Sequence, residues 1–187
     1  MNLQIIRDEL GECRRCRLSD GRTNIVFSSG PERPAWLFVG EAPGRDEDLS
    51  GVPFVGRSGK LLNELLSELG WSRNLVGVIN TVMCRPPGNR DPEPDEKEAC
   101  RPFLLKKIQA IQPSVITTLG RHATNSLRGI PMSISEARRH PFEFLGAKVI
   151  PTFHPSYVLH GALHARQEML HDFVHAISIL AEKGVVP

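Results

Sequence analysis

Short apolar runs alternate with amphipathic segments along most of the chain. The runs are rich in β-branched and aromatic residues and lack a helical period, so each is typical of a buried strand. The four predicted strands are Ala35–Val39, Val76–Met83, Ser114–Leu119 and Val149–Phe153.

Segments with apolar residues at helical spacing lie between these runs. Leu61, Leu62, Leu65 and Leu66 give the clearest example, in a helix expected from Ser58 to Leu69. The other predicted helices cover residues 2–10, 95–111, a short stretch reaching Leu127, and Ala162–Lys183. Residues 129–147 are expected to form a hairpin-like region, and residues 85–94 contain too much proline for regular structure.

This alternation predicts one α/β domain over residues 1–187. The expected architecture is a three-layer sandwich, with a central four-stranded parallel sheet and helices on both faces. A length of 187 residues suits a single domain.

Composition and charge narrow the functional class only slightly. The net charge is +2, which does not by itself indicate nucleic-acid binding. Two basic clusters, one around Arg14 and Arg15 and one at Arg138 and Arg139, fit either phosphate contacts or solvated faces. No apolar run approaches the length of about 18 residues that a membrane span needs, and no signal peptide is recognisable. We therefore expect a cytoplasmic protein that does not enter a membrane.

A loop rich in glycine, proline and acids directly follows the first strand. It reads Gly40-Glu-Ala-Pro-Gly44, continues through Asp46, Glu47 and Asp48, and is followed by Gly51-Val-Pro-Phe54-Val-Gly56. Ligands of open α/β sheets bind at the carboxyl ends of the strands, so this loop is a candidate binding loop. An ordinary connection with solvated acids is the alternative interpretation.

Two further polar residues are expected at the same edge of the sheet. Asn80 lies near the end of the second strand and His154 directly follows the fourth. Either could be an ordinary core residue whose polar atoms are hydrogen-bonded, but their shared placement with the Gly40 loop favours a pocket. The Asn80 amide could pair with the edge of a planar heterocycle, and Phe54 could stack on its face. Such a pocket would suit a base.

The cysteines indicate a second site. Cys13 and Cys16 form a Cys-x-x-Cys pair, while Cys84 and Cys100 flank the proline-rich segment. Disulfides are rare in the cytoplasm, so a metal or redox role is expected. Four thiolates suit either zinc or a [4Fe–4S] cluster, and the spacing leaves both open.

Taken together, these motifs closely resemble the iron–sulfur uracil-DNA glycosylases, family four of that superfamily. The resemblance runs from about residue 3 to residue 180. It rests on Cys13-x-x-Cys16, Gly40-Glu-Ala-Pro-Gly44-x-x-Glu47-Asp48, Gly51-x-Pro-Phe54-Val-Gly56, Asn80-x-x-x-Cys84-Arg-Pro-Pro87, Cys100 and His154-Pro-Ser156.

The resemblance implies an enzyme of base excision repair that hydrolyses the N-glycosidic bond of deoxyuridine in DNA and leaves an abasic site. It implies a [4Fe–4S] cluster on Cys13, Cys16, Cys84 and Cys100. It also implies a uracil-binding set: Gly40, Glu41, Ala42, Phe54, Asn80 and His154. In this family the phenylalanine stacks on the flipped uracil, the asparagine reads N3–H and O4, and the histidine bonds O2 and stabilises the departing anion.

The expected catalytic residues are Glu41, Glu47, Asn80 and His154. The best-known uracil glycosylases carry an aspartate where this chain has Ala42, so we expect backbone groups with Glu41 or Glu47 to hold the water. Pro43 and Ser156 are expected to pinch the DNA backbone, and Tyr157, Val158 and Leu159 to form the wedge that enters the base stack. A plain connection packed by Val158 and Leu159 is the alternative to the wedge.

We expect a monomer that acts on uracil-containing DNA, single- or double-stranded. Two alternatives stay open. One is a related glycosylase that takes another deaminated base or traps its sugar covalently. The other is a non-enzymatic iron–sulfur DNA-binding protein.

Overall fold

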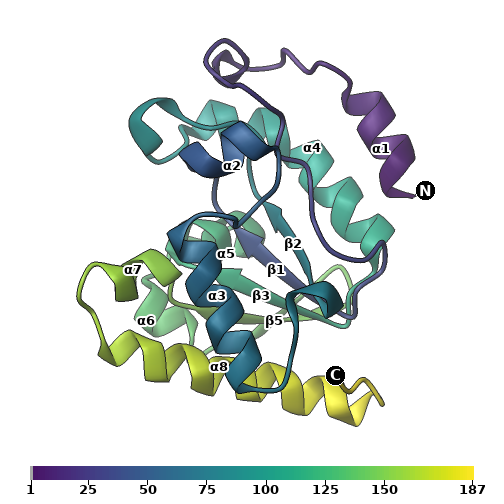
Figure 1. The fold of residues 1–187 in the computed structure, drawn as a ribbon. Helices are drawn as coiled ribbons and strands as arrows, with labels where there is room; N and C mark the ends of the chain where they lie inside the picture. The colour runs from purple at the N-terminus through teal and green to yellow at the C-terminus, as the bar shows by residue number, and fades with distance from the viewer. Residues whose placement is uncertain (1) are drawn as a thin grey trace.

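Four predicted strands form a parallel sheet in the structure, a computed structural model that describes residues 2–187 (Figure 1). They are β1 (Trp36–Gly40), β2 (Gly77–Asn80), β3 (Val115–Leu119) and β5 (Ala147–Thr152). The α/β class with a central parallel sheet and flanking helices is confirmed. Among residues 2–187, no helix combines the length and apolarity needed to cross a bilayer.

The expected number of strands is wrong, because a fifth strand lies at the edge. β4 (Phe142–Phe144) pairs antiparallel with β5. Leu145 and Gly146 form the tight turn between them, and both have positive φ angles, 49° and 82°. The hairpin expected within residues 129–147 thus begins later, and α6 (Ile134–Ala137) occupies its first part.

The strand order β2-β1-β3-β5-β4 creates the position where a ligand can bind. From β1 the chain moves to β2 on one side and then returns to β3 on the other side of β1. The connections at the carboxyl ends of β1 and β3 therefore diverge and leave a crevice between them. The parallel neighbours β2 and β5 end at the same edge.

Side chains of β1 alternate between two apolar layers, as the two-residue period of a strand requires. Trp36 and Phe38 face α3 (Arg57–Glu68) and α8 (His164–Glu182), in the same core cluster as Phe173 of α8. Leu37 and Val39 face α4 (Pro94–Ile111) and α5 (Arg121–Arg128). α1 (Leu3–Leu10) packs on the outer side of α4.

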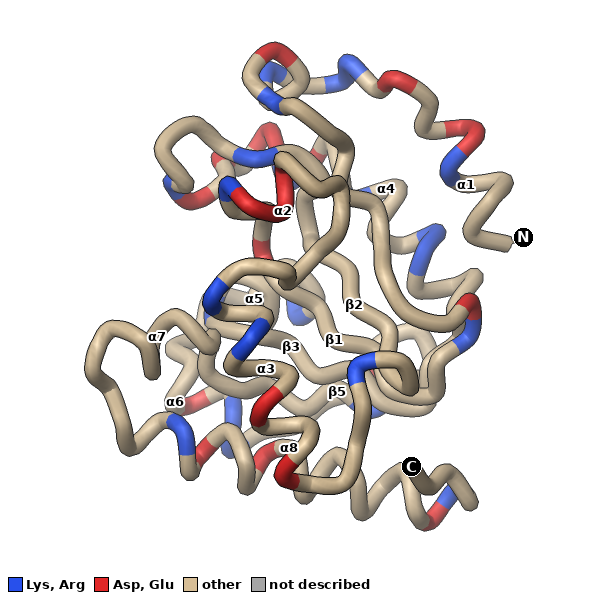
Figure 2. Tube along the Cα trace, in the orientation of Figure 1, with Lys and Arg blue, Asp and Glu red and all other residues tan. Residues whose placement is uncertain are grey.

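Two expected loops contain short helices. The acidic stretch after β1 forms α2 (Arg45–Ser50). Figure 2 shows its Asp and Glu residues in red. Asp46, Glu47 and Asp48 lie in its first turn, where the helix dipole favours negative charge. α7 (Pro155–Leu159) follows β5 and begins with a proline at its first position. Three single 3₁₀ turns complete the elements, at Arg17–Ser19, Arg73–Leu75 and Pro87–Asn89.

Gly59 lets the start of α3 touch the backbone of Phe54. A Cβ atom at position 59 would lie 1.8 Å from the carbonyl oxygen of Phe54 and 2.2 Å from its carbonyl carbon. No rotamer change relieves a collision with backbone, so any side chain here must displace the Phe54 loop or the helix.

We predict that Gly59→Ala destabilises the protein by about 1–3 kcal/mol, although alanine favours helix formation. Urea unfolding measures the change. Gly21→Ala is the matched control, because a Cβ atom at Gly21 meets nothing within 4 Å. A Gly59→Ala protein at least as stable as the wild type would contradict the contact.

Candidate active site

A cavity of about 630 Å³ opens at the carboxyl edge of the sheet. The residues that line it follow four different strands: Glu41 and Ala42 after β1, Asn80 at the end of β2, Gly120 to His122 after β3, and His154 and Ser156 after β5. Phe54, Pro43 and Glu47 complete the wall on the side of the Gly40 loop. The structure thus brings most of the residues singled out in the sequence into one pocket.

Gly40 sets how closely the pocket residues approach one another. A Cβ atom at this position would lie 2.4 Å from Oδ1 of Asn80 and 2.6 Å from the Phe54 ring. The missing side chain lets the asparagine amide and the aromatic ring lie together at the pocket floor. Phe54 is only 8% exposed, and its ring centroid lies 6.0 Å from that of His154.

Glu47 holds the loop that carries Phe54. Its carboxylate accepts hydrogen bonds from the backbone N–H groups of Gly44 (3.1 Å), Val55 (3.1 Å) and Gly56 (2.9 Å). Phe54 adopts a φ of 58°, a left-handed conformation that is costly for an aromatic residue. The Glu47 carboxylate therefore holds a strained aromatic residue beside Gly40.

Another acid of the loop is also structural. Asp48 is 3% exposed and accepts hydrogen bonds from the backbone N–H groups of Thr23 and Asn24. It ties the irregular segment before β1 to α2. Asp46 is exposed at the rim of the pocket. Glu41 differs from these acids. Its Oε1 is buried and has no hydrogen-bond partner among the described residues.

Asn80 carries a second buried oxygen without a partner. The residue is 1% exposed, and its Oδ1 accepts no hydrogen bond within residues 2–187. An unpaired buried amide oxygen costs about 1–3 kcal/mol, so its presence at a pocket wall points to a ligand that donates to it.

The His154 ring has a defined tautomer. The backbone N–H of Ser156 donates to Nδ1 at 3.1 Å, and the Ser156 hydroxyl lies 2.7 Å from the same nitrogen. The neutral ring therefore carries its proton on Nε2. Burial, with a smaller contribution from His160, lowers the pKa of His154 to about 4, so the ring is a neutral donor at physiological pH.

Burial has the opposite effect on Glu41. Burial, with a smaller contribution from the charge of Asp91, raises the pKa of this carboxyl group to about 7, against the opposing charges of Lys97 and Arg121. A carboxylate with a pKa near 7 is suited to accept a proton at neutral pH.

The four cysteines line one small cavity that shares no lining residue with the pocket. Cys13, Cys16, Cys84 and Cys100 all contribute to its wall, and all four are free thiols. Arg22 joins the segments around them: it donates to the carbonyl oxygens of Cys13 (2.6 Å) and Glu12 (3.0 Å) and lies 3.4 Å from the Cys84 sulfur. Four thiols that converge from separate segments fit a tetrathiolate metal centre.

The residues expected to contact DNA differ in accessibility. Tyr157 is 47% exposed and stacks on Phe153. Val158 is 7% exposed and belongs to the core, while Leu159 is partly buried against it. Pro43 and Ser156 both line the pocket.

Several pocket residues were missed in the sequence. Asn89, Arg90 and Asp91 come from the proline-rich segment, and Arg121 and His122 open α5. Arg121 and His122 could have been predicted from the sequence, because they closely follow the third predicted strand, at the same edge of the sheet as Gly40 and Asn80.

We predict that His154 stays neutral, with its proton on Nε2, throughout the range from pH 8 down to pH 5.5. Long-range ¹H–¹⁵N spectra of the histidine rings report both the charge and the tautomer, and His154→Gln identifies the signal. A titration midpoint near 6.5, or a proton on Nδ1, would contradict the assignment.

Comparison with known proteins agrees with this geometry. The model of the uracil DNA glycosylase superfamily matches residues 27–178. A type-4 uracil-DNA glycosylase from Thermotoga maritima is 44% identical over 97% of this chain and 96% of its own. Those from Saccharolobus solfataricus and Archaeoglobus fulgidus are each 42% identical, over 98% and 92% of this chain and 89% and 90% of their own. The chain therefore belongs to the uracil-DNA glycosylase superfamily and, within it, to the type-4 group.

Proposed function

We propose that this protein removes uracil from DNA by hydrolysing the N-glycosidic bond of deoxyuridine. The observation that carries the proposal is the unpartnered Asn80 amide, buried beside the Phe54 ring and opposite a neutral His154. The pocket supplies a stacking face, one amide edge and one ring donor, as uracil requires. The names of the type-4 relatives support the same activity.

Asn80 provides the base selectivity. Uracil presents N3–H as a donor and O4 as an acceptor, which match the Oδ1 and Nδ2 atoms of the side-chain amide. Cytosine presents an acceptor at N3 and a donor at N4, so it would face the amide with both groups reversed. Gly40, Ala42 and Phe54 shape the slot around the ring.

His154 stabilises the leaving group. Cleavage leaves the bonding electron pair on uracil as an anion delocalised onto O2. Nε2–H of the neutral imidazole donates to that oxygen as charge develops, and no proton needs to be transferred. The hydrogen bond from the Ser156 backbone keeps Nε2 as the donor.

The two glutamates have different roles in this proposal. Glu41 lines the pocket with an unpartnered oxygen, so it supplies negative charge near the oxocarbenium-like sugar and holds the attacking water with backbone groups. Glu47 contributes to catalysis through Phe54, because its carboxylate is already occupied by three backbone N–H groups.

Basic residues at the rim fit a DNA backbone. Arg45, Arg57 and Arg121 line the pocket and form no ion pair with a carboxylate within residues 2–187. They can contact phosphates on either side of an extruded nucleotide, single- or double-stranded. Tyr157 is the exposed member of the proposed wedge, with Pro43 and Ser156 at the backbone. We also propose that the enzyme acts as a monomer.

We propose that Cys13, Cys16, Cys84 and Cys100 hold a [4Fe–4S] cluster, and that a reducing cytoplasm keeps these thiols available. When bound, the cluster would cross-link the segment after α1 to the end of β2 and to α4. Burial raises the pKa of the Cys100 thiol to about 11, so a positively charged centre is needed to stabilise its thiolate.

The activity is tested with an oligonucleotide that contains a single uracil, incubated with the protein and then cleaved with alkali at abasic sites. We predict cleavage at uracil and none at cytosine. Asn80→Asp is expected to slow uracil release by roughly 10²–10³-fold, because a carboxylate cannot donate to O4 and repels the uracil anion. Asn63→Asp, on the exposed face of α3, introduces the same charge and serves as the control.

Unchanged activity and selectivity in Asn80→Asp would contradict this role of Asn80. Cleavage at hypoxanthine but not at uracil would favour a glycosylase for another deaminated base. Binding of the oligonucleotides without cleavage at any base would favour a non-enzymatic DNA-binding protein.

We predict that protein purified without oxygen is brown and contains about four iron and four sulfide per chain. Cys84→Ser and Cys100→Ser should each lose iron and visible absorption, measured by metal analysis and spectroscopy. A colourless protein with one zinc ion would overturn the cluster assignment and leave the pocket chemistry unaffected.

A further inference from the structure

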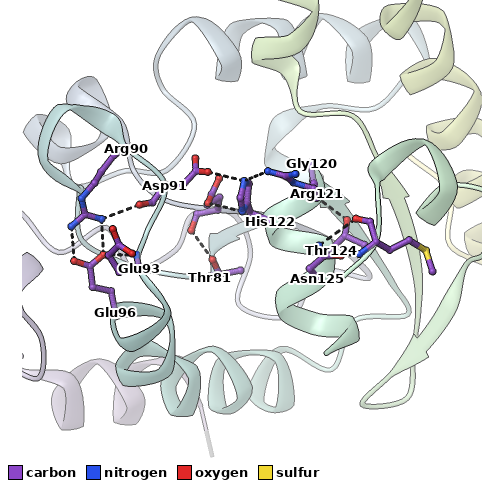
Figure 3. A network of polar contacts seen from close by, with 12 residues as sticks. Thr81, Arg90, Asp91, Glu93, Glu96, Gly120, Arg121, His122, Thr124 and Asn125 are labelled. Carbon is purple, nitrogen blue, oxygen red and sulfur yellow. Dashed lines mark hydrogen bonds and ion pairs between the residues drawn. The ribbon is translucent and has the colours of Figure 1, made fainter. Parts of the chain in front are cut away.

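Two titratable residues at the pocket rim, Asp91 and His122, have no role in the proposed function. Asp91 and His122 lie beside Glu41, and a ligand atom of each of the three lies within 4.8 Å of those of the other two. They come from three connections: the one after β1, the proline-rich segment before α4, and the start of α5. Figure 3 shows His122 with an oxygen of Asp91 on one side and the Arg121 side chain on the other.

The imidazole of His122 lies between two carboxylates. Its Nε2 lies 2.9 Å from Oδ2 of Asp91, and its Nδ1 lies 3.5 Å from Oε1 of Glu41. That Oε1 is the buried oxygen without a hydrogen-bond partner. A ring nitrogen of His122 thus lies close to the unsatisfied atom of the proposed catalytic glutamate.

Asp91 is itself held in place. Arg90 donates from Nη1 to the Asp91 carbonyl oxygen at 2.9 Å, and its guanidinium binds both oxygens of the fully buried Glu96. Glu96 also accepts from the backbone N–H of Glu93 at 2.8 Å. The segment that presents Asp91 to His122 is therefore fixed from both sides, as Figure 3 shows.

Nη2 of Arg121 also lies 3.1 Å from Nε2 of His122 and can only donate, so the position of the ring proton depends on whether Nε2 serves Arg121 or Asp91. When Nε2–H donates to Asp91, Nδ1 has a lone pair that faces a carboxylate oxygen. A proton shared between Nδ1 of His122 and Oε1 of Glu41 removes this repulsion. The pair therefore favours binding a proton when no substrate is present. The arrangement makes the pair a base whose affinity for a proton depends on Asp91.

We propose that Asp91 and His122 are positioning residues that orient the Glu41 carboxylate as the proton acceptor for the attacking water. This inference rests on the proposed glycosylase function. The water oxygen forms a bond to C1′ of the deoxyribose while the C1′–N1 bond breaks and its electron pair leaves with uracil. One water proton passes to Glu41, next to His122 Nδ1, and the product is an abasic sugar with a hydroxyl group on C1′.

The neighbouring charges set the sign of the expected pH dependence. Asp91 raises the pKa of Glu41, and Lys97 of α4 and Arg121 of α5 lower it, beside the larger effect of burial. Burial also lowers the pKa of His122, so its ring is neutral when Glu41 is ionised. The rate should fall as the pH falls through about 7, because a protonated Glu41 cannot accept the proton.

We predict three results for single-turnover uracil release between pH 5.5 and pH 9. Asp91→Asn moves the midpoint of the rate profile to lower pH, because it removes a negative charge that raises the pKa of Glu41. His122→Gln slows release at pH 8 on the order of ten-fold, since the glutamate loses its orienting partner. Glu41→Gln slows release by roughly 10² or more and removes the pH dependence.

Three controls separate positioning from a general structural effect. The inhibition constant of free uracil should stay unchanged in Asp91→Asn and His122→Gln, because Phe54, Asn80 and His154 are untouched. The double variant Asp91→Asn with His122→Gln should be no slower than His122→Gln alone, because Asp91 acts through His122. His175→Gln, on the exposed side of α8, should behave as the wild type.

Wild-type rate in His122→Gln together with an unchanged midpoint in Asp91→Asn would overturn the inference. Slower release with an unchanged pH profile and weaker uracil inhibition would overturn it too, because that pattern indicates a structural role. A wild-type protein that releases no uracil would instead refute the proposed function, so the two failures are distinguishable.

Discussion

The pocket depends on one carboxylate, that of Glu47, and its three hydrogen bonds to backbone N–H groups. These bonds join Gly44, at the start of α2, to Val55 and Gly56, just after Phe54. Phe54 is then confined between Gly40 and Gly59, the two glycines whose missing Cβ atoms make room for its ring and its carbonyl group. A left-handed φ at an aromatic residue is tolerated because the two residues that follow it are fixed.

The sequence predicted the parts of the fold that follow from long-range apolar pattern. The runs at β1, β3 and β5 and the leucines of α3 leave little choice of structure, and parallel strands bring their carboxyl ends to one edge. β4 was expected only as part of a hairpin-like region over residues 129–147, because Phe142-Glu143-Phe144 is too short to show a period. α2 was missed because its acids gave no apolar face, and their charge suggested a solvated loop rather than a first helical turn.

Site residues were predictable from the sequence where the residue type is unusual for its position, as for the polar Asn80 in a buried strand. They were less predictable where the residue type is common at such a position. The sequence alone does not distinguish the roles of Glu41 and Glu47. The hydrogen bonds in the structure do: the Glu47 carboxylate is bound by backbone N–H groups, whereas Glu41 has an oxygen without a partner among the described residues. Asp91 lies among prolines and His122 opens a surface helix, so their approach to Glu41 depends on how three connections pack. Val158 was named as part of a wedge, yet its side chain belongs to the core.

The cysteine site and the pocket are joined by the same short stretch of chain. Thr81, directly after Asn80, bonds to the Glu41 carbonyl oxygen at 2.7 Å, and Cys84 follows after two more residues. On the other side of the cavity, Arg17 next to Cys16 pairs with Asp95 and Glu96, and Glu96 holds the arginine that fixes Asp91. Whatever binds the four thiols therefore restrains both ends of the segment from Asn80 to Glu96. Because that segment carries Asp91 to the pocket rim, order around the four thiols and the geometry around Glu41 are physically linked.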